Sequence, residues 1–354
     1  MITGYFADRY FRILKRSGNL KKRLLMIISR RNAHKARKEF VRVEGRSVLT
    51  RQIKKEIKEY ARERFGSKTF WPYLALYTEA RGEFIRGWIP FDYFLYDLEP
   101  RLNPAIYKEL GNLKTFDYRL FGDFAVKPLF LYISGIFLNS DYMVIDEVEL
   151  KKILADHSQE IVVKQEFGWG GNQVRFIHAN EFRTGMLQKG TNYVIQPLIK
   201  QYKVLNDLCP DSVNTLRVTT FLKRDGSIDI VFVILRFGVD GSRVDNLVAG
   251  GQCISMDSAG RPSRIAYDDL GHEGGETHKN TGFRFADLSL PMFPEVIAKC
   301  KTEHQKYPYI RLIGWDVCLD ETGAPRLLEW NTARPTFDME DALLGPFFPD
   351  DSEF

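Results

Sequence analysis

The chain has 354 residues, of which 44% are hydrophobic and 27% are charged, and its formal net charge is +5. This composition is typical of a folded globular protein and excludes a disordered or fibrous chain, and the length is sufficient for two or three lobes. No apolar run reaches the roughly 20 residues that a membrane-spanning helix needs.

Residues 1–65 are predicted to form a basic helical region. No acidic residue occurs between Asp8 and Glu39, while aliphatic residues are interspersed with the cations. A basic helix with an apolar stripe can lie on an anionic membrane surface, so residues 9–38 predict peripheral membrane contact. The alternative is a solvated helix face that packs on the rest of the protein. We find no motif typical of nucleic-acid binding, and the start lacks the order of a secretory signal, so we expect a cytoplasmic protein, either free or associated with the membrane.

The rest of the chain changes pattern twice. Residues 70–104 are rich in aromatic residues and interrupted by prolines, which predicts irregular structure with short helices. From about residue 112, short apolar segments alternate with a predicted helix over 148–158. From residue 193 onward, runs with period-two alternation predict antiparallel strands, with one further helix at 291–308. The predicted class is α+β, with a helical N-terminal extension.

Three side chains that carry oxygen atoms occur in the predicted C-terminal hairpin. Asp316 lies in the strand segment IGWDVCLD, and Glu329 and Asn331 lie in RLLEWN. Side chains alternate along a strand, so Glu329 and Asn331 share a face, and Asp316 can lie opposite them if the two strands pair. Two carboxylates and an amide oxygen are suited to Mg²⁺. The alternative is a salt bridge to a buried arginine, since either partner would offset the cost of burying these groups.

A lysine followed by glycines forms the second pattern. Lys164 closes the apolar strand IVVK, where it would be costly without an anionic partner, and the segment EFGWGGNQV follows directly. Glycines allow backbone N–H groups to approach phosphate oxygens, although a simple hairpin turn would also use them. The lysine, the glycine loop and the later carboxylates together predict a phosphate-binding site.

These motifs, in this order, resemble the ATP-grasp superfamily, and more narrowly its sugar-transfer-associated proteins of bacterial polysaccharide biosynthesis. The segments that carry the resemblance are GWGGNQV, SVNTLRVTTF, VDNLVAGG and GWDVCLD…LLEWNTARP. The resemblance implies an ATP-grasp fold, in which two α+β lobes clasp a nucleotide. It also implies a central lobe over residues 66–150, a lid subdomain with the glycine loop and hinge over 151–202, and a C-terminal subdomain with the Mg²⁺ site over 203–354.

The resemblance implies roles for the cationic residues. Lys164 would contact the α- and β-phosphates of ATP, and Lys114 would be the second nucleotide lysine, with Lys127 as the competing candidate. Arg217 would reach the transferred phosphate or an acyl phosphate, and Arg334 is a second candidate for anion contact.

The remaining implied positions concern the nucleotide and the substrate. Their side chains or backbone groups would surround the ATP and the acid. Gly170 and Gly171 would cover the triphosphate; Gln196, Pro197, Leu198 and Ile199 would form the adenine hinge; Asn214, Asp245 and Asn246 would face the substrate; and Asp316, Glu329 and Asn331 would hold Mg²⁺. The superfamily often has Glu where this chain has Gln196.

The resemblance implies an ATP- and Mg²⁺-dependent carboxylate–amine ligase that acts through an acyl phosphate. Its small-molecule or sugar-linked substrates would belong to surface polysaccharide biosynthesis or modification. A kinase that phosphorylates a sugar hydroxyl on the same scaffold is the alternative, because phosphoryl transfer needs the same charge neutralisation. A non-catalytic nucleotide-binding module is a third possibility.

Overall fold

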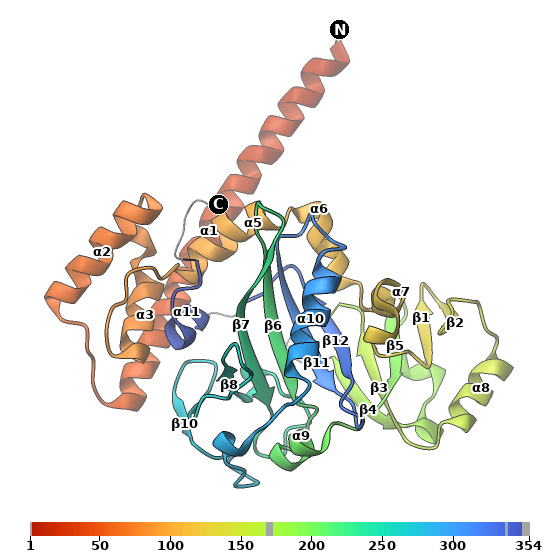
Figure 1. Cartoon of the computed structure of the whole chain (residues 1–354). Coiled ribbons are helices and arrows are strands. Elements are labelled where there is room, and N and C mark those ends of the chain that lie inside the picture. Colours follow the sequence, from red (N-terminus) through yellow and green to blue (C-terminus); the bar gives the residue numbers. More distant parts are fainter. Residues whose placement is uncertain (1, 168–172, 337–338, 349–354) are drawn as a thin grey trace. The chain divides into compact units, whose positions relative to one another are not determined.

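The computed structural model describes residues 2–167, 173–336 and 339–348, with the side chains of the first helix described from Leu20 onward. The chain divides into two compact units, one formed by residues 1–101 and 338–354 and the other by 102–337. Figure 1 shows the helices and strands of both. The division into four regions that the sequence predicts (residues 1–65, 66–150, 151–202 and 203–354) stays a prediction.

The first unit is helical. The helix that begins it runs from Ile2 to Glu44, and Gly66, with a φ of 73°, ends the second helix in the left-handed conformation that glycine adopts readily. Among the described residues its helical elements are α1 (Ile2–Glu44), α2 (Arg51–Phe65), η1 (Lys68–Phe70), α3 (Trp71–Arg81), α4 (Phe91–Tyr93), the π-helix η2 (Phe94–Leu98), α5 (Glu99–Leu102) and α11 (Glu340–Leu344).

The aromatic segment is more regular than predicted. Its first part forms the 11-residue helix α3, in which Pro72 occupies the first turn and Gly82 ends the helix with a φ of 85°. Proline is tolerated in the first turn because the N–H that it lacks would have no partner inside the helix. The prolines that suggested irregular structure therefore mark helix starts: Pro90 and Pro104 directly precede α4 and α6.

The second unit contains two antiparallel sheets joined by helices. The smaller sheet has the order β2-β1-β5-β3-β4 and the larger one the order β10-β9-β8-β7-β6-β11-β12. The smaller sheet comprises β1 (Phe130–Ile133), β2 (Ile136–Asn139), β3 (Glu160–Gln165), β4 (Val174–His178) and β5 (Tyr193–Pro197). The larger sheet comprises β6 (Thr215–Leu222), β7 (Ile228–Phe237), β8 (Gln252–Met256), β9 (Ala266–Tyr267), β10 (Glu273–Gly275), β11 (Leu312–Leu319) and β12 (Pro325–Asn331).

The helices of this unit are shorter. They are α6 (Ala105–Lys108), α7 (Asp117–Phe121), α8 (Glu147–Asp156), α9 (Lys203–Leu208) and α10 (Phe293–His304), with 3₁₀ turns η3 (Glu109–Asn112), η4 (Lys114–Phe116), η5 (Gly122–Phe124), η6 (Ala179–Glu181), η7 (Thr184–Met186), η8 (Leu247–Ala249) and η9 (Phe285–Asp287). The predicted α+β class and the helical N-terminal part are confirmed. No described helix is both long and apolar enough to cross a membrane.

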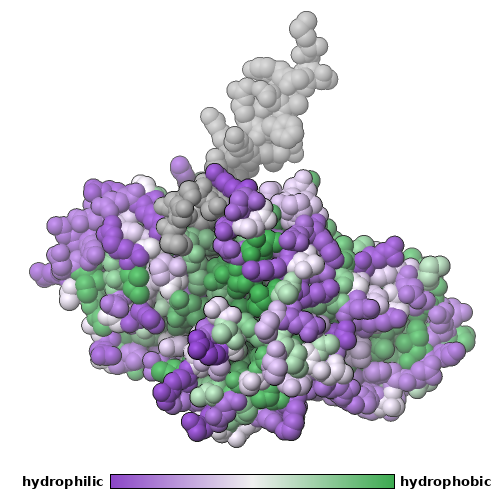
Figure 2. Space-filling view, in the orientation of Figure 1, coloured by the Kyte–Doolittle hydropathy of each residue, from purple (hydrophilic) through white to green (hydrophobic). Residues whose placement is uncertain are grey.

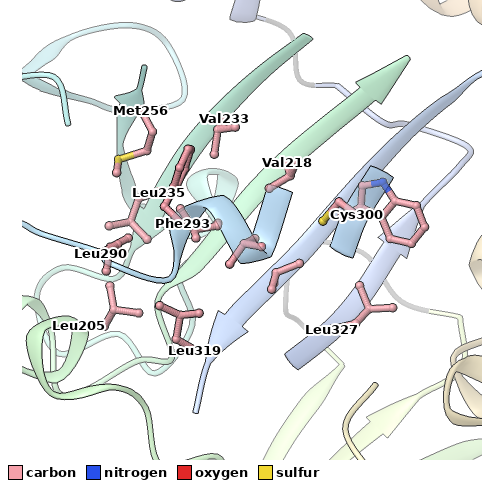
Figure 3. Close-up of a cluster of buried hydrophobic side chains, with 14 of the residues drawn as sticks. Leu205, Val218, Val233, Leu235, Met256, Leu290, Phe293, Cys300, Leu319 and Leu327 are labelled. Atoms are coloured by element: carbon pink, nitrogen blue, oxygen red, sulfur yellow. The ribbon is translucent and has the colours of Figure 1, made fainter. Parts of the chain in front are cut away.

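The larger sheet buries one face against α10. Val218, Val233 and Leu235 from the sheet pack with Phe293 and Cys300 from the helix (Figure 3). Side chains alternate along each strand, so this apolar set leaves the intervening residues on the opposite face of the sheet. That opposite face carries the polar residues described below.

The start of β11 is fixed by a buried asparagine. The Nδ2 group of Asn103 donates to the carbonyl oxygens of Leu312 and Thr332, both at 2.7 Å, and its Oδ1 accepts from the backbone N–H groups of Arg311 and Leu312 at 3.1 and 3.0 Å. One side chain thus satisfies backbone groups at the start of β11 and just after β12.

We expect Asn103→Ala to lower the free energy of unfolding by about 3 kcal/mol, because it leaves several buried backbone groups without partners. Chemical denaturation of both proteins would measure the difference. Asn180→Ala, at an exposed position, is the matched control and should stay within about 0.5 kcal/mol of the wild type. Equal stability of the Asn103 and Asn180 variants would contradict this structural role.

Candidate functional site

The polar face of the larger sheet gathers the carboxylates of the C-terminal hairpin. In the sheet register Asp316 lies opposite Glu329 on one side and opposite Arg217 on the other. The neighbouring pair, Trp315 and Trp330, points to the apolar face, where their ring centroids are 6.0 Å apart. The predicted pairing of the two strands is therefore confirmed.

Asp316 is held by two buried arginines. Its Oδ1 accepts from Arg217 Nε, its Oδ2 accepts from Arg217 Nη2 at 3.0 Å, and Arg236 Nη2 lies 3.0 Å from the same Oδ2. Burial opposes the charged form, but the two guanidinium groups outweigh it and lower the pKa of Asp316. The salt bridge to a buried arginine, which was the alternative to a metal ligand, is thus present. Magnesium binding by Asp316 and phosphate contact by Arg217 stay predictions.

Arg236 is a site residue that the sequence reasoning missed. Its Nη2 donates to Thr215 Oγ1 at 2.7 Å, and its Nε lies 3.5 Å from Asp245 Oδ2. Asp245 also accepts a hydrogen bond from Thr215 Oγ1, so the predicted substrate residue joins the same network as Asp316. The signal was available, because Arg236 interrupts the apolar run VFVILRF just as Lys164 closes IVVK.

Two lysines lie near Glu329 from the other side of the site. The Nζ of Lys114 is 3.6 Å from Glu329 Oε2. Burial lowers the pKa of Lys164, and the charge of Glu329 opposes that shift, which places Lys164 within electrostatic reach of the same carboxylate. Burial and the charge of Glu329 raise the pKa of the nearby Asp117 well above its ordinary value.

The choice between Lys114 and Lys127 as the second nucleotide lysine stays a prediction. Lys127 is exposed, and its Nζ lies 6.0 Å from the ring centre of Tyr118. Lys114 lies in the 3₁₀ turn η4. The structure thus places Lys114 beside Glu329, with the charge of Glu329 also acting on Lys164.

The oxygen donors of the site suit a metal ion that arrives with an anion. Asn331 Nδ2 donates to Asp316 Oδ2 at 3.3 Å, so the side-chain amide of Asn331 lies beside that carboxylate. The site combines four basic side chains with four acidic ones: Lys114, Lys164, Arg217 and Arg236 with Asp316, Glu329, Asp245 and Asp117. Burial raises the pKa of Asp245 and of Asp117. Among the described residues, no group of three His, Cys, Asp or Glu side chains could hold a metal ion alone. Glu329 and Asn331 fit Mg²⁺ bound to a polyphosphate.

The predicted hinge begins in the last two residues of β5, the central strand of the smaller sheet, and continues past its end. Gln196 is buried, and its Nε2 donates to the carbonyl oxygen of Val126 at 3.0 Å. Pro197 ends β5, and Leu198 and Ile199 continue from it, partly buried. The Gln196 side chain thus fixes a neighbouring backbone segment, and adenine contact by these residues stays a prediction.

Two predicted substrate residues have structural contacts. The Nδ2 of Asn214 donates to the carbonyl oxygens of Leu205 and Cys209 at 2.7 and 3.0 Å, which satisfies the C-terminal end of α9. The Oδ1 of Asn246 accepts from the N–H of Val248 at 2.9 Å and caps η8. These bonds give both side chains a positioning role, and direct substrate contact stays a prediction.

The other predicted positions are less informative. Arg334 is exposed in the segment after β12, and its anion contact stays a prediction. Gly170 and Gly171 lie outside the described residues. The strand that leads to them ends at a described network, in which Glu166 accepts from Thr115 Oγ1 and from Asn192 Nδ2, the latter at 2.6 Å.

The two sheets are joined near this site by Arg243, from the segment between β7 and β8. Its Nη1 and Nη2 donate to Glu160 Oε1 and Oε2 at 2.9 and 2.8 Å, and its guanidinium carbon lies 3.9 Å from the ring centre of Phe176. Glu160 and Phe176 belong to β3 and β4 of the smaller sheet. The contact therefore ties the segment that carries Asp245 to the sheet that carries Lys164.

Residues 184–342 match the family model described as sugar-transfer associated ATP-grasp. This match confirms the resemblance that the sequence motifs predicted, over a little less than half of the chain. A search of curated proteins found no match to this chain.

Solved structures with similarity to the chain include three enzymes. The ATP-grasp ligase PsnB, complexed with a phosphomimetic variant of its minimal precursor, Mg and ADP, is 14% identical with a TM-score of 0.39 over 70% of this chain and 59% of its own. D-cycloserine synthetase DcsG is 13% identical with a TM-score of 0.41 over 68% and 70%. D-alanyl-alanine synthetase A from Vibrio cholerae O1 biovar eltor is 14% identical with a TM-score of 0.39 over 69% and 62%. The chain thus spans about three fifths of the length of the first of these.

We expect Asp316→Asn to flatten the acid limb of the stability–pH profile. The folded-state pKa of Asp316 is lowered, so its contribution is complete above the unfolded pKa of about 4 and is lost as the pH falls from there through the folded-state pKa. Thermal unfolding between neutral pH and the acid limit would show a smaller decrease in Tm for the variant than for the wild type.

Asp156→Asn, at an exposed position on α8, is the matched control for that measurement. It should keep the wild-type pH profile. Parallel profiles for wild type and Asp316→Asn would contradict the ion pairs of Asp316 with Arg217 and Arg236 as a source of acid sensitivity.

Proposed function

We propose that this protein is an ATP- and Mg²⁺-dependent carboxylate–amine ligase that acts through an acyl phosphate. The observation that carries the proposal is the convergence of Lys114, Lys164, Arg217 and Arg236 around Glu329 and Asp316 on one sheet face. A buried site with that many cations is suited to a polyanion. The match of residues 184–342 to an ATP-grasp family supports ATP as that polyanion.

The lysines and the arginines would have different roles in the reaction. Lys114 and Lys164 would bind the phosphates of ATP from the side of Glu329. Arg217 and Arg236 would stabilise the negative charge that develops on the transferred phosphoryl group and on the acyl phosphate. Such positioned charges account for most of the catalysis in phosphoryl transfer, because the protein forms no covalent bond in that step.

Glu329 and Asn331 would hold Mg²⁺ together with the phosphates, with Asp316 beside them. When bound, Mg²⁺ neutralises phosphate charge and orients the phosphates for in-line transfer. Gly170 and Gly171 would belong to a loop that covers the triphosphate and excludes water, so that an amine meets the acyl phosphate before hydroxide does. The amine nitrogen would then attack the acyl carbon, and phosphate would leave.

The description of the matched family, sugar-transfer associated, supports a sugar-related substrate. We propose that the acid is a sugar-linked or small-molecule carboxylate, such as a uronic acid or an amino acid, used in surface polysaccharide biosynthesis or modification. Asp245, which shares Thr215 with Arg236, would be positioned on the substrate side of the site. The expected location is the cytoplasm, where ATP is available.

We expect Glu329→Gln to lower the turnover number by about a hundredfold or more, since the neutral amide removes a ligand charge from a metal-dependent step. Release of ADP and phosphate, measured with candidate acids and amines, gives the rate. Glu321→Gln, at an exposed turn position between β11 and β12, is the matched control and should keep wild-type turnover. Unchanged activity of Glu329→Gln would remove the metal assignment.

The same assay separates ligation from phosphorylation. Phosphate release that depends on the amine, with an amide as the second product, supports a ligase. Phosphate retained on an organic product without an amine requirement supports a kinase, which needs the same nucleotide site. ATP turnover without either product would contradict both.

We expect Lys114→Met to weaken Mg-ATP binding by about tenfold or more, because one buried charge opposite the phosphates is lost. Isothermal titration calorimetry would measure the dissociation constant. Lys127→Met removes an exposed lysine near Tyr118 and should change that constant by less than about twofold. The opposite ranking of the two variants would assign the second nucleotide lysine to Lys127.

A further inference from the structure

The first helix, α1, has one face that packs within its own unit. Met26, Ala33 and Phe40 are buried, at a spacing of seven residues that returns to the same side of the helix every two turns. Ser29 lies on this side too, with its Oγ 3.1 Å from Tyr73 Oη on α3. This face accounts for the packing that the sequence offered as the alternative to membrane contact.

Some of the cations of α1 belong to that packed face. Arg30 Nε lies 2.6 Å from Asp92 Oδ2, and Arg37 Nη1 lies 2.9 Å from Glu79 Oε1, with both carboxylates buried. These arginines are therefore used inside the unit. They are not part of the outward charge of the helix.

The opposite face carries aliphatic side chains in contact with solvent. Leu20, Leu24, Ile27 and Ile28 are exposed by 71%, 57%, 46% and 44%. Their spacing of four, seven and eight residues from the first places all four on one stripe of the helix. A single exposed leucine is ordinary, but four on one stripe form a contiguous apolar surface.

The neighbouring helix α2 shows how a solvated helix of this chain is built. Its exposed positions are polar or charged, with both Lys55 and Arg62 and the acidic Glu56 and Glu63. In Figure 2 the outer surface of α2 is correspondingly hydrophilic. The aliphatic stripe of α1 therefore needs an apolar partner that α2 does not need.

The charge next to the stripe selects the kind of partner. Lys21, Arg23, Arg31 and Lys35 are exposed on the same helix, and the sequence holds no acidic residue from Arg9 to Lys38. A second copy seated on this stripe would bring cations against cations. An anionic lipid surface offers both an apolar phase for the aliphatic side chains and negative headgroups for the cations.

We propose that the outward face of α1, formed by Leu20, Leu24, Ile27 and Ile28 and the exposed cations beside them, binds the surface of an anionic membrane. The helix would lie in the headgroup region with its packed face still on the protein. This proposal is independent of the reaction that the other unit performs, because every residue it uses belongs to α1.

Vesicle co-sedimentation of the full chain tests the proposal. The protein should bind vesicles of phosphatidylcholine mixed with phosphatidylglycerol and should bind vesicles of phosphatidylcholine alone much more weakly. The variant Leu24→Ser/Ile28→Ser should lower the partition coefficient by about tenfold or more, since two aliphatic side chains no longer enter the lipid. The variant Arg31→Gln/Lys35→Gln should lower it by about fivefold per charge, and added salt should remove that difference.

The matched control is Val148→Ser, which removes an aliphatic side chain exposed by 76% on α8. It should leave vesicle binding unchanged. Equal binding by the wild type and both α1 variants would overturn the proposal, and so would equal binding to the two kinds of vesicle. Self-association that Leu24→Ser/Ile28→Ser abolishes, without vesicle binding by the wild type, would assign the stripe to a second copy and overturn it as well.

Discussion

The ion cluster of Asp316 with Arg217 and Arg236 is the interaction on which the larger sheet and its site depend. A carboxylate at 6% exposure is stable only with charged partners, and here they come from β6, which pairs with β11 and carries Arg217, and from β7, the next strand, which carries Arg236. The partners are fixed by strand register and not by loops. The same alternation that directs Trp315 into the apolar core directs Asp316 toward the arginines, so packing and electrostatics constrain one another.

The smaller sheet and the segment before it contribute charged side chains to the site. Lys164 on β3 and Lys114 on η4 both act on Glu329, and burial lowers the pKa of Lys164. The two lysines and the two arginines concentrate positive potential at one site. That potential attracts a polyanion before any specific contact forms, which is why the nucleotide and its Mg²⁺ belong together in the proposal.

Much of the larger sheet could be predicted because its strands alternate strictly, and so could the C-terminal hairpin of β11 and β12. Lys164 and Glu329 were recognisable because a charged residue in an apolar strand needs a partner. The contacts that sequence could not give depend on tertiary register. Nothing local indicates that Arg236 meets Asp316, or that the amide of Asn214 satisfies the end of α9. The regularity of α3 was missed because prolines mark helix starts as well as irregular segments.

The Arg243 contact gives the two sheets of the site a particular kind of connection. Its bidentate bond with Glu160 lies at an exposed position, where dissolved ions screen the attraction, whereas its stacking on Phe176 depends less on ionic strength. One side chain, Arg243, thus connects the segment between β7 and β8 to β3 through an ion pair and to β4 through a cation–π contact. Because the two contacts respond differently to ionic strength, Arg243 still contacts Phe176 when salt weakens its ion pair with Glu160.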